Sequence, residues 1–285
     1  MYKTGKPSRV RESLDIKHFL PNEGIEPLVP DESNQTFLMS DNSKRCFGIS
    51  IAGYTLQVET FYVNTFRMCS GYLYDLRDQM PDIRISITMD DIEYERKEAM
   101  SANLRRDDGY LETLAVYRKI SEAMLDYDTF LMHGAVIAVE NRGFMFTAES
   151  GTGKTTHIRK WLQNLEKSYV VNGDKPLIKI TEDQILACGT PWCGKERMGT
   201  NTMVDLKAIV LMERAIDNSI NEISYNEAFT LLLQQTYRPN GTEKVFKTLR
   251  LISRLKEKVH FYRFRFNNMK DDTFSVAYNV LCSLS

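Results

Sequence analysis

Hydrophobic and polar positions in the first part of the chain follow a pattern that predicts a small βαβ-like unit. Apolar residues alternate over residues 47–58 around a Gly-Tyr turn, which predicts a two-stranded hairpin. Over residues 62–76 they recur every three or four positions, the spacing of one helix face, and over residues 83–89 they alternate again. We therefore expect an N-terminal α+β accessory module over residues 1–105, of which residues 1–45 form an extended lead-in.

The pattern changes after a charged stretch over residues 90–108, which we interpret as a solvated helix and a link. Short apolar runs then predict strands at 135–139, 144–147, 169–171, 208–212 and 259–266. Amphipathic segments predict helices at 109–124, 158–165, 226–235 (capped by Asn226), 245–255 and 274–281. The mixture predicts an α/β core over residues 106–285.

The composition is that of a globular protein of one large or two modest domains, because 42% of its 285 residues are hydrophobic and 26% are charged. Lys and Arg number 37 against 38 Asp and Glu, so the net charge is -1. No overall field therefore draws the chain to nucleic acid or to an anionic membrane. There is also no basic block, so we expect neither partner.

Several features predict a cytoplasmic location. The polar, basic N-terminus is unlike a secretory signal, and no apolar run approaches the ~20 residues of a membrane-spanning helix. The five cysteines are scattered, which fits a reducing compartment better than a disulfide framework. Cysteines and histidines show no zinc-ligand spacing, so a structural zinc site is not expected.

The strongest chemical signal is the segment Ala148-Glu149-Ser150-Gly151-Thr152-Gly153-Lys154-Thr155. It matches the phosphate-binding P-loop, G-x-x-x-x-G-K-[ST], except that Ala148 replaces the first glycine. Glycines at 151 and 153 let backbone N–H groups converge on phosphate oxygens, with the N-terminus of the next helix behind them. Lys154 can reach the β- and γ-phosphates, and the Thr155 hydroxyl can coordinate Mg²⁺.

The surroundings of the loop favour this interpretation. A predicted strand precedes it, and an apolar stripe beginning at Ile158 predicts an amphipathic helix that starts right after Lys154. The alternative is a Gly/Ser loop that merely joins a strand to a helix. Asp174 follows the predicted strand 169–171 and is the candidate second Mg²⁺ ligand, although its Asn-Gly-Asp-Lys-Pro setting is also that of an ordinary turn.

These residues resemble a family. Residues 130–285 are similar to the mixed-sheet P-loop kinase core of HPr kinase/phosphorylase and phosphoenolpyruvate carboxykinase, in which a His-Gly strand, an S-G-x-G-K-[ST] loop and an Asp-Asp pair follow one another. Here these correspond to His133-Gly134, Ser150–Thr155 and Gly173-Asp174. Glu149 resembles an acid of the HPr kinase loop, whereas Thr152 and Thr156 resemble the carboxykinase loop. A nearer kinship is suspected with bacterial HPr-kinase-like proteins, some of them encoded beside peptide-modifying enzymes.

The resemblance implies ATP and Mg²⁺ as ligands, with residues 150–156 on the nucleotide and with Thr155 and Asp174 on the metal. Gly173 departs from the family pattern, since the missing Asp leaves the general base unassigned. His133 and Glu149 are candidates for the general base. The alternatives are that His133 is a hydrogen-bonded histidine of the core and that Glu149 is an exposed carboxylate at the start of a helix. HPr kinases are hexamers, so the resemblance allows this chain to form a homo-oligomer. No residue of this sequence by itself indicates one.

The loop Gly189–Arg197 brings Lys195 and Arg197 into consideration as groups that clamp phosphate charge or the acceptor. The alternative is a surface turn with solvated charges.

Together these features predict an ATP-dependent kinase that transfers the γ-phosphoryl group to a hydroxyl, with serine of a protein or peptide implied by the resemblance. A non-catalytic nucleotide-binding regulatory or scaffold protein is the main alternative, and Gly173 favours it. A carboxykinase-type lyase is less favoured, because 285 residues leave little room for its additional metal and substrate sites.

Overall fold

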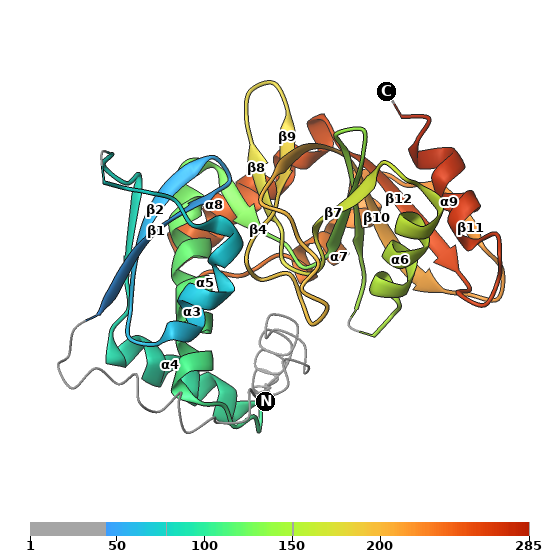
Figure 1. Cartoon of the computed structure of the whole chain (residues 1–285). Coiled ribbons are helices and arrows are strands. Elements are labelled where there is room, and N and C mark those ends of the chain that lie inside the picture. The colour runs from blue at the N-terminus through green and yellow to red at the C-terminus, as the bar shows by residue number, and fades with distance from the viewer. Residues whose placement is uncertain (1–43, 78, 150, 285) are drawn as a thin grey trace, which may run out of the picture.

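The computed structural model describes residues 44–77, 79–149 and 151–284, so the expected lead-in over residues 1–45 lies almost wholly outside the described residues. Two sheets organise this part of the chain, a three-stranded sheet and a larger mixed sheet (Figure 1). No helix among the described residues is both long and apolar enough to cross a bilayer.

The small sheet has the βαβ-like arrangement that the sequence pattern predicts. Strands β1 (Arg45–Ile51) and β2 (Tyr54–Thr60) form an antiparallel hairpin, and β3 (Ile83–Ser86) lies parallel to β2. The helix expected over 62–76 is shorter, however, since α3 (Val63–Met68) and the 3₁₀ turn η1 (Ser70–Tyr72) end before Leu73. Leu73 forms a bridge with Ile49, so pairing with the edge of β1 overrides the helical spacing.

Two helices follow the small sheet. The charged segment forms α4 (Met89–Ser101), which begins with a capping box between Thr88 and Asp91, and α5 (Asp108–Ala123) is capped by Asp107. The buried face of α5 shares one hydrophobic core with β1–β3. The boundary between residues 105 and 106 remains a prediction, but α5 packs with the element group on its N-terminal side.

The large sheet is mixed, with the strand order β4-β8-β9-β10-β6-β5-β7. Strand β12 runs parallel to the end of β10, β6 is also parallel to β10, and β11 pairs with β12. Its strands are β4 (Thr129–Leu131), β5 (Ala135–Val139), β6 (Arg142–Thr147), β7 (Ser168–Asn172), β8 (Leu177–Ile180), β9 (Ile185–Cys188), β10 (Met203–Arg214), β11 (Ser219–Glu222) and β12 (His260–Phe266). Strands β5 and β6 form an antiparallel hairpin that turns at Glu140 and Asn141, which both have positive φ.

Helices cover both faces of this sheet (Figure 1). Alternate residues of β5 and β6 contribute to two separate cores, since Val136 packs with α7 (Tyr225–Gln234) and α8 (Thr242–Arg254), whereas Ile137 packs with α6 (Lys154–Asn164) and α9 (Thr273–Leu281). The described chain is therefore a mixed α/β fold. The cap of α7 is Ser224, not Asn226, because Ser224 and Glu227 form a reciprocal capping box.

Candidate active site

The predicted phosphate-binding loop joins a central strand to a helix. It leaves β6, whose neighbours are β10 and β5, and enters α6 at Lys154. Gly151 and Gly153 have φ of 78° and 124°, values that L-residues other than glycine rarely adopt. The positive φ of Gly153 is what favours glycine there, because the atom nearest to an added Cβ, 2.7 Å away, is the Asn268 side-chain nitrogen, which can move aside. Ser150 lies outside the described residues.

Side chains hold this loop in place. The Thr152 hydroxyl donates to the Glu149 carbonyl at 2.7 Å. At the end of β10, Arg214 donates to the carbonyls of Thr152 and Gly151 at 3.0 and 2.6 Å. The Thr152 backbone N–H also donates to the Glu149 carbonyl, at 3.3 Å, and the loop ends at the N-terminus of α6, the end of a helix that favours anions. Nothing in the local sequence around Arg214 marks this role.

Lys154 is almost buried, with 8% of its surface exposed. Its ammonium donates to the Ala148 carbonyl at 2.9 Å and to the Glu149 carbonyl at 3.4 Å. Burial lowers the pKa of Lys154 to about 8, and the negative charge of Asp174 opposes that shift. The ammonium therefore remains the main form at neutral pH and is strongly favoured when an anion binds beside it.

The Asn172 side chain holds the backbone turn that contains Asp174. The Asn172 side-chain oxygen accepts hydrogen bonds from the backbone N–H groups of Asp174 and Lys175, at 2.8 and 2.7 Å. The Asn172 amide nitrogen donates to the Thr190 hydroxyl at 2.9 Å, which ties the turn to the following loop. The turn and the functional interpretation of Asp174 are thus compatible, because the turn fixes the backbone while the carboxylate stays available.

Two basic side chains flank the Asp174 carboxylate. Lys175 Nζ lies 3.1 Å from Oδ2, and His133 Nε2 lies 3.2 Å from Oδ1. Burial alone would raise the pKa of Asp174, but Lys175 and His133 outweigh it and hold that pKa well below its usual range. Asp174 is therefore ionised at neutral pH, which suits a metal ligand better than a proton acceptor. Nothing in the sequence around Lys175 marks it, although its side chain is fully buried.

His133 is a buried residue that contacts the site through Asp174. Its Nδ1 lies 2.7 Å from the Gln235 side-chain oxygen, and its carbonyl accepts from the Thr147 hydroxyl at 2.7 Å. Burial, reinforced by the Lys175 charge, lowers the pKa of His133 to about 4, so the ring is neutral at pH 7. A neutral ring carries one N–H, so it can donate to the Gln235 side-chain oxygen or to the Asp174 carboxylate but not to both. The part of His133 as a base stays a prediction.

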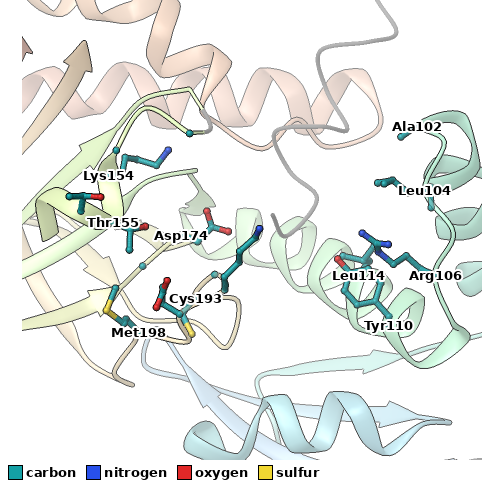
Figure 2. A pocket seen from close by; sticks show the side chains of 18 of the residues that line it. Ala102, Leu104, Arg106, Tyr110, Leu114, Lys154, Thr155, Asp174, Cys193 and Met198 are labelled. Atoms are coloured by element: carbon teal, nitrogen blue, oxygen red, sulfur yellow. The ribbon is translucent and has the colours of Figure 1, made fainter. Parts of the chain in front are cut away.

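A cavity of about 790 Å³ opens in front of these groups (Figure 2). Most of the residues predicted for the site line this cavity: Gly151, Gly153, Lys154, Thr155, Thr156, Asp174 and Lys195. Glu149, Thr152, His133 and Arg197 are not among its lining residues. The Glu149 side chain is exposed, and its carbonyl, not its carboxylate, takes part in the loop's hydrogen bonds.

The loop that carries Lys195 is anchored on both sides. The Trp192 indole N–H donates to the Thr113 carbonyl on α5 at 3.3 Å, and its ring contacts Tyr117 with centroids 5.2 Å apart. Glu196 forms an ion pair with Arg159 on α6 at 2.6 Å. The loop therefore bridges the helix of the phosphate-binding loop and the helix packed on the small sheet.

The far wall of the cavity was not anticipated from the sequence. It comes from the end of α4, the α4–α5 connection and the start of α5, and it carries Ala102, Leu104, Arg106, Tyr110 and Leu114 (Figure 2). These side chains lie about 34 to 46 positions before Ala148, so only the tertiary packing of α5 brings them to the site.

The residues present fit a magnesium–nucleotide. The Thr155 hydroxyl and the Asp174 carboxylate are hard oxygen donors on one cavity, and the carboxylate has lone pairs beyond those facing His133 and Lys175. Mg²⁺ bound with nucleotide ordinarily takes one or two protein oxygens, with phosphate oxygens and water completing its octahedron. No cluster of three or more His, Cys, Asp or Glu side chains suited to a metal occurs in the described ranges.

Comparison with known proteins leaves the family open. No family model matches the chain, and no curated protein sequence is similar to it. Among solved structures, the chain is similar to the HPr(Ser) kinase/phosphatase of Coxiella burnetii, with a TM-score of 0.31 and 10% identity over 52% of this chain and 94% of that one. A likeness of this size carries no assignment of activity.

Proposed function

We propose that this protein binds Mg-ATP at the 148–155 loop and transfers the γ-phosphoryl group to a hydroxyl, serine of a protein or peptide being the first candidate. The observation that carries the proposal is the meeting of Lys154, Thr155 and Asp174 on one cavity, directly where β6 feeds α6. Phosphoryl transfer demands mostly positioning and charge neutralisation, and these residue types supply both.

Each group has a definite task in this proposal. Backbone N–H groups of the loop and the Lys154 ammonium bind the phosphate oxygens, while Thr155 and Asp174 hold the metal. Mg²⁺, when bound, neutralises charge on the β- and γ-phosphates. The Lys175 ammonium keeps the Asp174 carboxylate ionised, and the His133 ring lies against its other oxygen. Lys195, on its anchored loop, adds positive charge at the cavity.

The proposed phosphoryl transfer needs no dedicated strong base. The acceptor oxygen forms a bond to the γ-phosphorus as the bond from that phosphorus to the β–γ bridging oxygen breaks, ADP leaves, and the hydroxyl proton passes to solvent. In a loose transition state the nucleophile develops little bonding before the leaving group departs, so proton removal contributes less than charge stabilisation does. This accounts for an active site in which Gly173 supplies no second carboxylate.

One observation favours a second function, nucleotide-dependent regulation without transfer. Among the described residues, the carboxylates lining the cavity are Asp174 and Glu196, and both already form ion pairs. A protein that only senses Mg-ATP needs no other acid.

Ligand-dependent thermal stability tests nucleotide binding. Mg-ATP at a hundred times its Kd adds about 2.7 kcal/mol to the stability of the folded state, which raises Tm by several degrees. We expect Lys154→Ala to remove this shift. Lys167→Ala should keep it, since Lys167 is exposed between α6 and β7 and does not line the cavity. Thr155→Val should weaken Mg-ATP binding about tenfold while leaving ATP binding in EDTA unchanged, because it removes one metal ligand.

Turnover separates the two functions. Incubation with γ-labelled ATP and a serine-containing peptide library should label peptides in the wild type and not in Lys154→Ala. Binding of Mg-ATP that is lost in Lys154→Ala, without transfer to any acceptor, would support the regulatory function instead. Equal Mg-ATP affinity in Lys154→Ala and wild type would refute the phosphate-binding role of the loop.

A further inference from the structure

The cavity extends well beyond the groups that hold phosphate. Lys154, Thr155 and Asp174 lie on one side of it, and Leu104, Arg106 and Tyr110 lie on the other (Figure 2). Its volume of about 790 Å³ is near the upper part of the range for small-molecule sites, so a polypeptide side chain can enter beside a nucleotide. The two walls belong to different cores, the first to the large sheet and the second to the small sheet.

Among the described residues, the acidic side chains that line the cavity form ion pairs, whereas two basic side chains on its walls do not. Asp174 is paired with Lys175, and Glu196 is paired with Arg159. Arg106 and Lys195, by contrast, line the cavity without forming an ion pair to any carboxylate of the described residues. The charge left to attract a ligand is therefore positive, and on the far wall it resides in Arg106.

Arg106 is positioned before any ligand arrives. Its guanidinium lies over the Tyr110 ring, 5.5 Å from the ring centroid, and one of its nitrogens donates to the Arg105 carbonyl at 3.1 Å. The remaining N–H groups of the planar guanidinium can donate to both oxygens of a carboxylate. Tyr110 is itself fixed at the start of α5, where its backbone N–H donates to the Asp107 cap at 2.8 Å.

The neighbouring side chains fit an extended peptide rather than a second nucleotide phosphate. Leu104 adds apolar surface to the wall that carries Arg106, Asn103 adds an amide, and the small side chain of Ala102 at the end of α4 leaves space. Such a wall, one cation on a mainly apolar surface, suits the side chains of a polypeptide that carries a single acid. A triphosphate is instead matched by the N–H-rich loop on the opposite wall.

We propose that the α4–α5 wall binds the phosphoacceptor polypeptide and that Arg106 pairs with a carboxylate lying close to the hydroxyl that is phosphorylated. This inference rests on the proposed kinase function and specifies its substrate class as an acidic peptide segment. The carboxylate belongs either to an Asp or Glu side chain or to a chain end. Trp192 joins α5 to the loop that bears Lys195, so it fixes the position of the acceptor wall relative to the phosphate-binding side of the cavity.

The test is a positional peptide library in which a serine is fixed, every other position is varied in turn, and transfer from γ-labelled ATP is measured. Half of the library has amidated C-termini and half has free ones, which distinguishes a side-chain carboxylate from a chain end. The wild type should phosphorylate peptides with an acid at one preferred position at least about tenfold faster than peptides with Lys there, the effect of one charged hydrogen-bonded pair.

Variants assign that preference to a residue. Arg106→Gln should abolish the acidic preference and Arg106→Glu should shift it toward Lys, while Mg-ATP affinity stays within about twofold of the wild type. Arg105→Glu is the matched control, because Arg105 is the exposed neighbour that does not line the cavity, and it should keep the preference. Circular dichroism and Tm confirm that each variant folds, with Arg106→Gln as the milder change.

Different results would contradict the acceptor site alone and the kinase function as a whole. Retention of the acidic preference in Arg106→Glu, or a tenfold loss of Mg-ATP affinity in both Arg106 variants, would overturn the acceptor site while leaving the kinase function in place. Absence of transfer to any peptide by a wild type that binds Mg-ATP would overturn the kinase function and the acceptor site together.

Discussion

The buried pair between Asp174 and Lys175 yields the most quantitative expectation. Asp174 is 4% exposed and Lys175 is 2% exposed, with Nζ 3.1 Å from Oδ2. Asp174→Asn keeps the shape of the side chain but deprives the Lys175 ammonium of that negative charge. Removing one partner of a buried pair typically costs about 3–5 kcal/mol of unfolding free energy. We expect about 3 kcal/mol, because burial already lowers the pKa of Lys175 and the amine can release its proton.

Urea denaturation at pH 7, followed by fluorescence of the two buried tryptophans, measures this loss. The double variant Asp174→Asn/Lys175→Met removes both charges and should regain at least about 2 kcal/mol, since a buried pair replaced by uncharged groups is often neutral. A double variant no more stable than Asp174→Asn would refute the reasoning.

Acidification adds an independent check with a definite sign. The folded-state pKa of Asp174 is lowered below its unfolded value, so its stabilisation is present above the unfolded pKa of about 3.9 and is lost as pH falls toward the folded pKa. The difference in unfolding free energy between the wild type and Asp174→Asn should therefore narrow below about pH 4. A difference that stays constant down to pH 2 would contradict the assigned shift.

Two further expectations concern the phosphate-binding loop. Gly153→Ala should cost about 1–3 kcal/mol of stability and abolish Mg-ATP binding, because φ at this position is 124°. Gly71→Ala, in open space, should change stability by less than about 0.5 kcal/mol. Urea titrations measure the stability of both variants, and thermal shifts measure their Mg-ATP binding. The affinity for ATP should fall up to about tenfold per pH unit above pH 8, because Lys154 loses its proton there in the unliganded protein. Calorimetric titration between pH 7 and 9.5 should show that the affinity of Lys154→Arg depends less on pH. An equally weak pH dependence in the wild type would exclude the titration of Lys154 as its cause.

The chemistry-bearing loop could be predicted from sequence because all its information is local. A strand, two glycines, Gly-Lys-Thr and an amphipathic helix stand next to one another, and each element appears in the structure where the pattern places it. The β5–β6 hairpin was predictable for the same reason, since its strands and two-residue turn are contiguous. Their functional roles remain predictions, as the geometry alone tests no activity.

The partners of Asp174 were harder to predict because they depend on tertiary contacts. Gln235 follows His133 by 102 positions, and nothing near either residue announces that their side chains meet. Lys175 looks like a solvated charge in a turn, and only its burial reveals a structural pairing. The helix expected to reach Leu76 illustrates the same limit, since a bridge to β1 outweighs helical spacing at Leu73.

Gly173 has a packing explanation that changes how its departure from an Asp-Asp pair is understood. A Cβ at this position would lie 2.7 Å from the Cys193 carbonyl oxygen and 3.1 Å from the Met198 carbonyl oxygen, both of them backbone atoms. The loop that carries Lys195 thus occupies the space that a carboxylate would need, and its attachment through Trp192 to α5 leaves it little freedom to withdraw. The absent acid and the closely packed basic loop are two consequences of one arrangement. If this site transfers phosphate, it does so with positive charge brought close to the cavity instead of a second carboxylate, and the acceptor must be one whose hydroxyl reacts without a strong base.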